Sequence, residues 1–139
     1  MAELVMMKGL PLSGKTEWAM KWADESVSRV RVSWTDILKS MSRCNRRDVR
    51  PVAVEAALRM VTACLRMGYD VVVDEENLNP VEFGLFVGRA AMCRCKVRWV
   101  VMETTVEECK RRNALMGHPV ADMEIDRKAE RYADWLKRK

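Results

Sequence analysis

The sequence predicts an α/β fold with a central parallel sheet of about four strands and helices on both faces. Three observations support this prediction. Short apolar segments alternate with helical segments, glycine or polar residues directly follow the apolar segments, and no linker or internal repeat divides the 139 residues. A strand, helix, strand order implies parallel strands joined by right-handed crossovers. We therefore expect one three-layer domain over residues 1–139.

The first half of the chain contains two expected strands and three expected helices. The first strand ends at Gly9, and the helix after it has apolar positions spaced one turn apart. Pro51 is expected to open a longer helix, because proline is favoured in the first turn of a helix. The predicted order is strand 4–8, helix 15–25, strand 30–34, helix 36–41 and helix 51–66.

The second half begins with a segment that is nearly all apolar and β-branched. This composition indicates a strand covered on both faces, as the inner strands of a parallel sheet are. Pro80 is expected to start the next helix, and a break near Gly117 separates the last two helices. The predicted order is strand 69–73, helix 80–92, strand 97–102, helix 106–115 and helix 122–137.

Composition and charge narrow the class of protein. Hydrophobic residues make up 49% and charged residues 32% of the chain, and no apolar run is long enough to span a bilayer. The N-terminus has no basic leader or cleavage site, so we expect a cytoplasmic protein without a membrane partner. The five cysteines are irregularly spaced, which indicates free thiols rather than a zinc site. A net charge of +5 favours a polyanionic partner.

Residues 9–16 read Gly-Leu-Pro-Leu-Ser-Gly-Lys-Thr, which matches the spacing of a phosphate-binding P-loop. Glycines let the backbone curl until successive N–H groups point at an anion, at the positive end of the following helix. In such a loop Lys15 reaches the β- and γ-phosphates of ATP, and the Thr16 hydroxyl binds Mg²⁺. The residues predicted to bind the nucleotide are Gly9, Pro11, Ser13, Gly14, Lys15 and Thr16.

An acidic motif follows the third expected strand, which runs into Asp74, Glu75 and Glu76. An acidic residue at the tip of a buried strand, beside a phosphate loop, commonly holds Mg²⁺ or its water shell. In a parallel sheet this motif and the P-loop meet at the carboxyl ends of the strands. We predict that Asp74 or Glu75 serves the metal, with Asp74 as the first choice, and that Glu76 is solvated.

Together these motifs resemble those of the bacteriophage-type 5′-hydroxyl polynucleotide kinases, a family of P-loop kinases. The resemblance covers nearly the whole chain in order, and Asn-Leu-Asn-Pro after the third strand is its most particular part. It implies a P-loop kinase fold with a short lid, ATP and Mg²⁺ as cofactors, and a hydroxyl of DNA or RNA as acceptor. It rests on residues 9–19, residues 35–40, residues 71–80 and residues 110–113.

The resemblance implies a catalytic role for Asp36, which follows the second expected strand. Asp36 would be the general base on the acceptor hydroxyl, and Lys15 would act on the transferred phosphate. A base must lie within hydrogen-bond reach of the attacking oxygen, so its place at a strand end suits this chemistry. Helix capping is the alternative, because either Asp36 or Thr35 could cap the helix that begins here.

Four further residues are predicted to contact the acceptor. Lys39 would hold the acceptor's phosphate, where the family carries an arginine, so a point charge replaces bidentate recognition. Trp34 either stacks on an acceptor base or packs as a core residue at the strand end. Asn77 and Asn79, both in the Asn-Leu-Asn-Pro sequence, are also placed on the acceptor side.

The expected lid departs from the family pattern. Met116 falls near the position of a family arginine that touches the transferring phosphate, so Arg112 or Arg111 would have to supply this catalytic charge. Glu75 also stands where the family has an aspartate. These departures leave three alternative functions open: a kinase of a hydroxymethylated base, such as 5-hydroxymethyluracil in phage DNA, a nucleoside or other small-molecule kinase, and a nucleotide-binding module without phosphotransfer.

Overall fold

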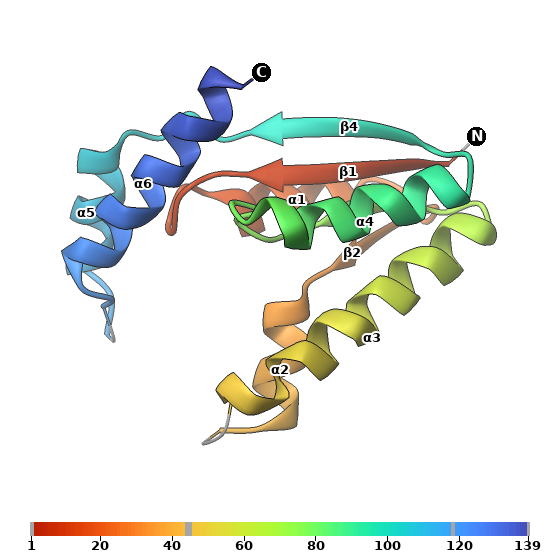
Figure 1. Cartoon of the computed structure of the whole chain (residues 1–139), viewed down its shortest axis with the longest axis horizontal. Helices are drawn as coiled ribbons and strands as arrows, with labels where there is room; N and C mark the ends of the chain where they lie inside the picture. Colours follow the sequence, from red (N-terminus) through yellow and green to blue (C-terminus); the bar gives the residue numbers. More distant parts are fainter. Residues whose placement is uncertain (1, 44–45, 118, 139) are drawn as a thin grey trace.

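The computed structural model describes residues 2–43, 46–117 and 119–138. Strands and helices alternate through this part of the chain, and each lies close to where the sequence predicts one (Figure 1). The elements are β1 (Glu3–Lys8), α1 (Lys15–Asp24), β2 (Arg29–Val32), α2 (Trp34–Met41), α3 (Arg46–Arg66), β3 (Asp70–Val73), α4 (Pro80–Met92), β4 (Lys96–Val101), α5 (Val106–Ala114) and α6 (Asp122–Lys137).

The described strands form a parallel sheet of four in the order β2-β3-β1-β4. Leu4 and Met6 of β1 pair with Val71 and Val73 of β3, and on its other side β1 pairs with β4 along its length. The two inner strands are almost completely buried, as their apolar composition predicts. This sheet confirms the predicted α/β class.

Helices cover both faces of the sheet, which makes three layers. On one face Trp22 of α1 packs in a cluster with Val5 of β1. On the other face lie α3 and α4 (Figure 1). Their residues Leu58 and Phe86 pack with Met6 of β1. Alternate residues of β1 therefore enter opposite cores, as the period of two along a strand requires.

The α5–α6 pair stands at the carboxyl ends of β1 and β4 (Figure 1). Cys109 of α5 and Ile125 of α6 form a small buried cluster with Leu10. Because Leu10 lies in the loop after β1, this cluster ties the pair directly to the predicted P-loop. The pair is in the position expected for the lid.

A buried lysine also joins α6 to the sheet. Lys8, the last residue of β1, is 0% exposed, and its Nζ lies 4.0 Å from the ring centre of Phe83 and 4.2 Å from that of Trp135. The ring centre of Trp99 is 4.8 Å away. Cation–π attraction of this kind strengthens when water is excluded. Residues from α4, β4 and α6 therefore meet around the end of β1.

Three predicted boundaries are wrong by two residues or more: the end of β2, the start of α2 at Trp34 and the start of α3. α3 begins at Arg46, and Pro51 lies inside it. Pro51 is exposed, so water can satisfy the carbonyl that its missing N–H leaves unbonded one turn earlier. β2 ends at Val32 instead of residue 34, because Ser33 leaves the strand and caps α2 by accepting the backbone N–H of Asp36.

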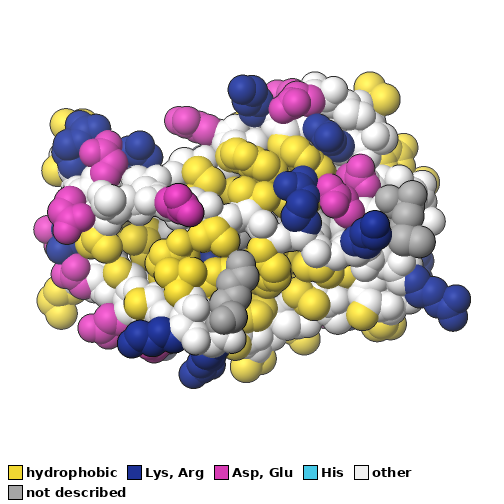
Figure 2. Space-filling view, turned by 90° about the horizontal axis from the view of Figure 1, so that it is seen from above, with side chains coloured by type: hydrophobic (Ala, Val, Ile, Leu, Met, Phe, Trp, Pro, Cys, Tyr) yellow, Lys and Arg dark blue, Asp and Glu magenta, His cyan; other side chains and the backbone are white. Residues whose placement is uncertain are grey.

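Figure 2 shows the molecule from above, the side on which β4 forms the edge of the sheet in Figure 1. Hydrophobic side chains gather in the middle of this view, and charged side chains lie mostly around them. No helix in the described part of the chain combines the length and the hydropathy needed to cross a membrane.

Candidate active site

The loop between β1 and α1 encloses the ammonium group of Lys15. Its Nζ donates hydrogen bonds to the backbone oxygens of Leu10 at 2.7 Å and Gly9 at 3.2 Å, and lies 3.4 Å from Oγ of Ser13. Burial lowers the pKa of Lys15, and the nearby carboxylates of Glu76 and Asp74 partly oppose this shift. A buried cation therefore sits inside the curl of the loop.

The backbone of this loop has room for an anion and little room for side chains. Gly14 precedes α1 at a φ of 97°, and the first turn of α1 has no side-chain cap. A Cβ on Gly9 would lie 2.7 Å from Oγ of Ser13. Uncapped N–H groups at a helix N-terminus next to a lysine are the donors that a phosphate needs. The loop therefore fits the phosphates of ATP.

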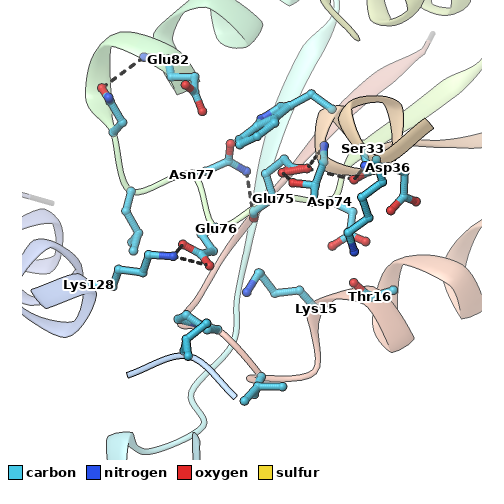
Figure 3. Close-up of a pocket in the computed structure, with 18 of the residues that line it drawn as sticks. Lys15, Thr16, Ser33, Asp36, Asp74, Glu75, Glu76, Asn77, Glu82 and Lys128 are labelled. Carbon is cyan, nitrogen blue, oxygen red and sulfur yellow. Dashed lines mark hydrogen bonds and ion pairs between the residues drawn. The ribbon is translucent and has the colours of Figure 1, made fainter. Parts of the chain in front are cut away.

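Two hollows adjoin the loop. The smaller, of about 510 Å³, lies over residues 12–17 and is bounded by Arg112. The larger is a cleft of about 650 Å³ that runs from the P-loop past the carboxyl ends of β2 and β3 to α2, α4 and α6 (Figure 3). The predicted site residues that line this cleft are Pro11, Lys15, Thr16, Trp34, Asp36, Lys39, Asp74, Glu75, Asn77 and Asn79.

Glu75 fastens α2 to the end of β3. Its Oε1 accepts hydrogen bonds from Oγ of Ser33 at 2.9 Å and the backbone N of Thr35 at 3.0 Å, and its Oε2 accepts one from Oγ1 of Thr35 at 2.7 Å. Burial raises the pKa of Glu75 to about 7, although these donors act in the opposite direction. Because both oxygens are engaged, the geometry favours Asp74 over Glu75 as the metal carboxylate.

Asp36 lies in the first turn of α2 and faces the cleft (Figure 3). Its side chain is 53% exposed, and its Oδ2 contacts Nη1 of Arg31 at 2.7 Å. Ser33 caps α2, so the alternative that Asp36 or Thr35 is the cap is wrong. The carboxylate of Asp36 is therefore not used as a helix cap, and it lies in the cleft in contact with Arg31.

The two asparagines have structural contacts. Nδ2 of Asn77 donates to the backbone oxygens of Met7 at 2.6 Å and Glu75 at 3.3 Å, which joins the loop after β3 to β1. Oδ1 of Asn79 caps α4 by accepting the backbone N–H of Val81 at 3.0 Å. These contacts explain the Asn-Leu-Asn-Pro sequence as a loop anchor followed by a helix start. Their acceptor-binding role remains a prediction.

Trp34 and Lys39 lie at the end of the cleft formed by α2. Trp34 is half-buried, packs against the main core, and its ring centre is 4.4 Å from the guanidinium carbon of Arg50. Arg50 pairs with Glu82 of α4 at 2.7 Å. Trp34 is thus both a core residue and a lining residue, and Arg50 adds a cation to this end of the cleft.

Arg111 and Arg112 occupy different places on α5. Nη1 of Arg112 donates to the backbone oxygen of Leu12 in the P-loop at 2.9 Å, and its Nε contacts Glu108 at 3.1 Å. Arg111 is 64% exposed, pairs with Glu108 at 2.6 Å, and lines neither of the two hollows. The structure therefore brings Arg112 to the P-loop and leaves Arg111 outside.

Lys128 of α6 contributes a further cation to the cleft. Its Nζ contacts Oε2 of Glu76 at 2.8 Å and Oε1 at 3.0 Å (Figure 3). The backbone oxygen of Glu76 accepts the N–H of Gly9 at 3.4 Å, so this pair lies beside the start of the P-loop. The prediction that Glu76 is a solvated carboxylate is therefore wrong. Lys128 could not be predicted as a cleft residue, because many residues of α6 are charged and nothing in the local sequence distinguishes this lysine from them.

A magnesium ion would need ligands from more than the protein. The described residues contain no group of three or more His, Cys, Asp or Glu that could hold a metal. Mg²⁺ in phosphotransferases is commonly bound through one or two protein oxygens, nucleotide phosphates and water. Thr16 and Asp74 both line the cleft beside Lys15 and fit that arrangement.

The sheet order, the P-loop and the cleft at the carboxyl ends of the strands define a P-loop kinase-type nucleotide-binding domain. Residues 4–137 match the model of the AAA_33 family, which is described as an AAA domain, and the chain belongs to this family. No curated protein sequence matches the chain.

Solved structures share the fold at low sequence identity. A chain of the Pnkp1/Rnl/Hen1 RNA repair complex matches with a TM-score of 0.83 and 18% identity, over 99% of this chain and 46% of that one. Mycobacterium tuberculosis APS kinase CysC, in complex with AMPPNP and APS, matches with a TM-score of 0.64 and 19% identity, over 82% and 69%. Chaetomium thermophilum Kti12, in complex with ADP-AlF3, gives 0.63 and 17%, over 92% and 79%.

These structural likenesses show the fold of the chain. The chain spans less than half the length of the RNA repair protein that it matches. Identities below 20% show the shared fold and do not distinguish one acceptor from another. The P-loop kinase fold is therefore confirmed, whereas the resemblance to the phage-type polynucleotide kinases stays a prediction at the level of the family and its acceptor.

Proposed function

We propose that this chain transfers the γ-phosphate of ATP to a hydroxyl of a nucleic acid, most specifically the 5′-hydroxyl end of DNA or RNA. The observation that carries the proposal is the shape of the cleft: Lys15 and Thr16 line one end, and Asp36, Lys39 and Trp34 line the other. A donor phosphate and an acceptor can thus meet in one space. The likeness to a chain of an RNA repair complex supports a nucleic acid as acceptor.

In this proposal each part of the site has a distinct task. ATP supplies the phosphoryl group when it is bound. Lys15 and the N–H groups at the start of α1 hold its phosphates, while Thr16 and Asp74 hold Mg²⁺. Asp36 accepts the proton of the acceptor hydroxyl. Arg112, fixed on the loop through Leu12, adds positive charge where negative charge develops.

The acceptor end of the cleft suits a polyanion with bases. Lys39 and Arg50 are both cations and Trp34 offers an aromatic surface, so phosphate attraction and base stacking are both supplied. The net charge of +5 adds a general attraction for nucleic acid. The prediction that Lys39 binds an acceptor phosphate and that Trp34 contacts a base belongs to this proposal.

A panel of acceptors with γ-labelled ATP tests the proposal. The panel contains single-stranded and duplex DNA and RNA with 5′-hydroxyl ends, the same strands with 5′-phosphate ends, DNA with 5-hydroxymethyluracil, nucleosides, and adenosine 5′-phosphosulfate. We expect label on the 5′-hydroxyl strands and none on the 5′-phosphate strands. Label on the modified base or on a small molecule would show that this compound, and not a 5′-hydroxyl end, is the acceptor. Bound ATP without any labelled product would show a non-catalytic module.

A further inference from the structure

Arg31 lies between two carboxylates that come from different elements of the fold. It belongs to β2, whereas Asp36 is on α2 and Asp74 follows β3. Its Nε and Nη2 contact Oδ2 of Asp74 at 2.8 Å and 2.7 Å, and its Nη1 contacts Oδ2 of Asp36 at 2.7 Å. One planar guanidinium therefore bridges both acidic groups.

The two ends of the bridge differ in burial. The side chain of Asp74 is 2% exposed and that of Arg31 is 17% exposed, whereas Asp36 is 53% exposed. A buried carboxylate without a partner is costly, so the Asp74 end is fixed. An exposed ion pair contributes little to stability and exchanges easily. Arg31 is thus anchored at Asp74 and presents Nη1 to a carboxylate that stays accessible from the cleft.

The backbone of Asp36 is positioned by other contacts. Ser33 caps α2, and Glu75 holds both Ser33 and Thr35. These bonds fix where α2 begins, but they leave the direction of the Asp36 side chain open. Arg31 contacts the carboxylate of Asp36 from one side and so favours one direction of that side chain.

Arg31 also reduces the negative charge of the cleft. Asp36 and Asp74 are two negative groups in the cleft that also contains Lys15. Phosphates carry negative charge, and like charges at close range repel. The guanidinium neutralises one of the two carboxylates before a nucleotide enters.

We propose that Arg31 is a positioning residue that is anchored on Asp74 and aims the carboxylate of Asp36 at the acceptor hydroxyl. The inference rests on the phosphotransfer proposed above. A guanidinium reaches both carboxylates because its N–H groups form a rigid fork, whereas a lysine offers a single point charge. Arg31 acts through Asp36 and does not touch the reacting atoms itself.

The test compares three variants of the full chain. Arg31→Lys keeps a cation beside Asp74 but loses the bridge, and Arg31→Met loses both. Arg29→Met is the matched control, because Arg29 is on the same strand and contacts the backbone oxygen and the ring of Trp22, away from the cleft. For each protein, kcat and KM are measured with γ-labelled ATP and a 5′-hydroxyl oligonucleotide. The dissociation constant of ATP and the melting temperature are measured separately.

We expect a split between kcat and the binding constants. General bases contribute 10²- to 10⁴-fold, so misdirecting one should lower kcat about 10-fold in Arg31→Lys and about 100-fold in Arg31→Met. The KM for the oligonucleotide and the dissociation constant of ATP should stay within about 3-fold of wild type in Arg31→Lys. Arg29→Met should stay within about 2-fold in all constants.

Three results would overturn the inference. One is an active wild-type protein whose kcat changes less than about 3-fold in both Arg31 variants. Another is an Arg31→Lys variant that loses ATP binding together with kcat, which would make Arg31 a purely structural residue. The third is a wild-type protein that labels no acceptor, which would overturn the proposed function and this inference with it. Only the first two results leave the proposed function intact.

Discussion

The donor side and the acceptor side of the cleft are built in different ways. On the donor side, Lys15 contacts atoms of its own loop, no more than six residues away along the chain. On the acceptor side, Glu75 reaches back to Ser33 and Arg31 reaches forward to Asp74, over 42 and 43 residues. The contacts of Lys15 thus form a local motif, to which Arg112 and Lys128 are added from the α5–α6 pair, and the acceptor side is an assembly of long-range pairs.

This difference predicts how substitutions affect ATP binding and phosphoryl transfer. The donors of the P-loop are backbone groups at a helix end, so its geometry does not depend on the side-chain pairs of the acceptor side. An assembly of side-chain pairs changes whenever one partner changes. We therefore expect ATP binding to tolerate substitutions on the acceptor side, while transfer to the acceptor does not. The predictions below test this separation, from the largest expected effect on transfer to the smallest.

Replacing Lys15 by Met should remove the main contact of the donor side with the phosphates of ATP. Loss of the cation that faces the phosphates should lower transfer by about 10³-fold and weaken ATP binding. Burial lowers the pKa of Lys15, so removing its charge should leave the protein without nucleotide at least as stable as before. Transfer assays, calorimetry and thermal melting report these three effects. Lys21→Met, an exposed change on the same helix, is the control, and normal transfer by Lys15→Met would contradict the prediction.

Replacing Asp36 by Asn should stop transfer and spare ATP binding. Asparagine keeps the shape of the side chain but cannot accept the proton, so kcat should fall on the order of 10²-fold or more. The dissociation constant of ATP should stay within about 3-fold of wild type. Steady-state kinetics and calorimetry on one preparation provide both values. A fully active Asp36→Asn variant would show that another group is the base.

The two arginines of α5 offer a matched pair. Arg112 is held on the P-loop through Leu12, whereas Arg111 lines neither hollow. Arg112→Met should therefore lower kcat about 10-fold, and Arg111→Met should change it less than about 2-fold. Both variants lose one partner of Glu108, so this loss is matched between them. Equal effects of the two substitutions would place the catalytic charge elsewhere.

Glycine substitutions test how tightly the loop is packed. A Cβ on Gly9 would meet Oγ of Ser13 at 2.7 Å and Cβ of Met102 at 3.0 Å, whereas one on Gly84 of α4 meets no atom within 4 Å. Gly9→Ala should shift the loop and weaken ATP binding about 5-fold, since overpacking of this kind costs about 1–3 kcal/mol. Gly84→Ala should leave binding unchanged and favour the helix. Calorimetry distinguishes the two, and unchanged ATP affinity in Gly9→Ala would contradict the close packing.

Glu75 should affect stability more than transfer. Its pKa is raised to about 7 in the folded state from 4.5, so between these pH values the folded state binds more protons than the unfolded state. The free energy of unfolding should therefore fall as pH rises from about 4.5 to 7, by on the order of 2 kcal/mol. Glu75→Gln should remove this part of the pH dependence. Urea unfolding at several pH values measures it, and identical pH dependence in both proteins would contradict the prediction.

The sequence predicts the donor side well because its signals are local. The P-loop spacing places Lys15 and Thr16, and the apolar run before Asp74 places that carboxylate at a strand end, where the structure has it. The parallel sheet follows from the alternation of short apolar strands with helices. Each of these signals is carried by neighbouring residues and by periodicity.

The contacts of the acceptor side could not be predicted from the sequence, for a physical reason. Arg31 stands in an Arg-Val-Arg-Val strand, and its neighbour Arg29 has the same local pattern but contacts Trp22 instead of the cleft. Which charge meets which carboxylate depends on how strands and helices pack, and the one-dimensional pattern does not contain that information. The start of α3 before Pro51 was missed because exposure of the proline decides whether it is tolerated.

The most direct test of the central claim is a crystal structure of the chain with a non-transferable ATP analogue, Mg²⁺ and a 5′-hydroxyl oligonucleotide. The proposed function predicts the triphosphate at the N-terminus of α1 around Lys15, and the 5′ oxygen within about 3 Å of a carboxylate oxygen of Asp36. A strand end that lies elsewhere, away from the carboxylate of Asp36, would contradict the proposed acceptor. A nucleotide bound away from the P-loop would contradict phosphotransfer in this cleft altogether.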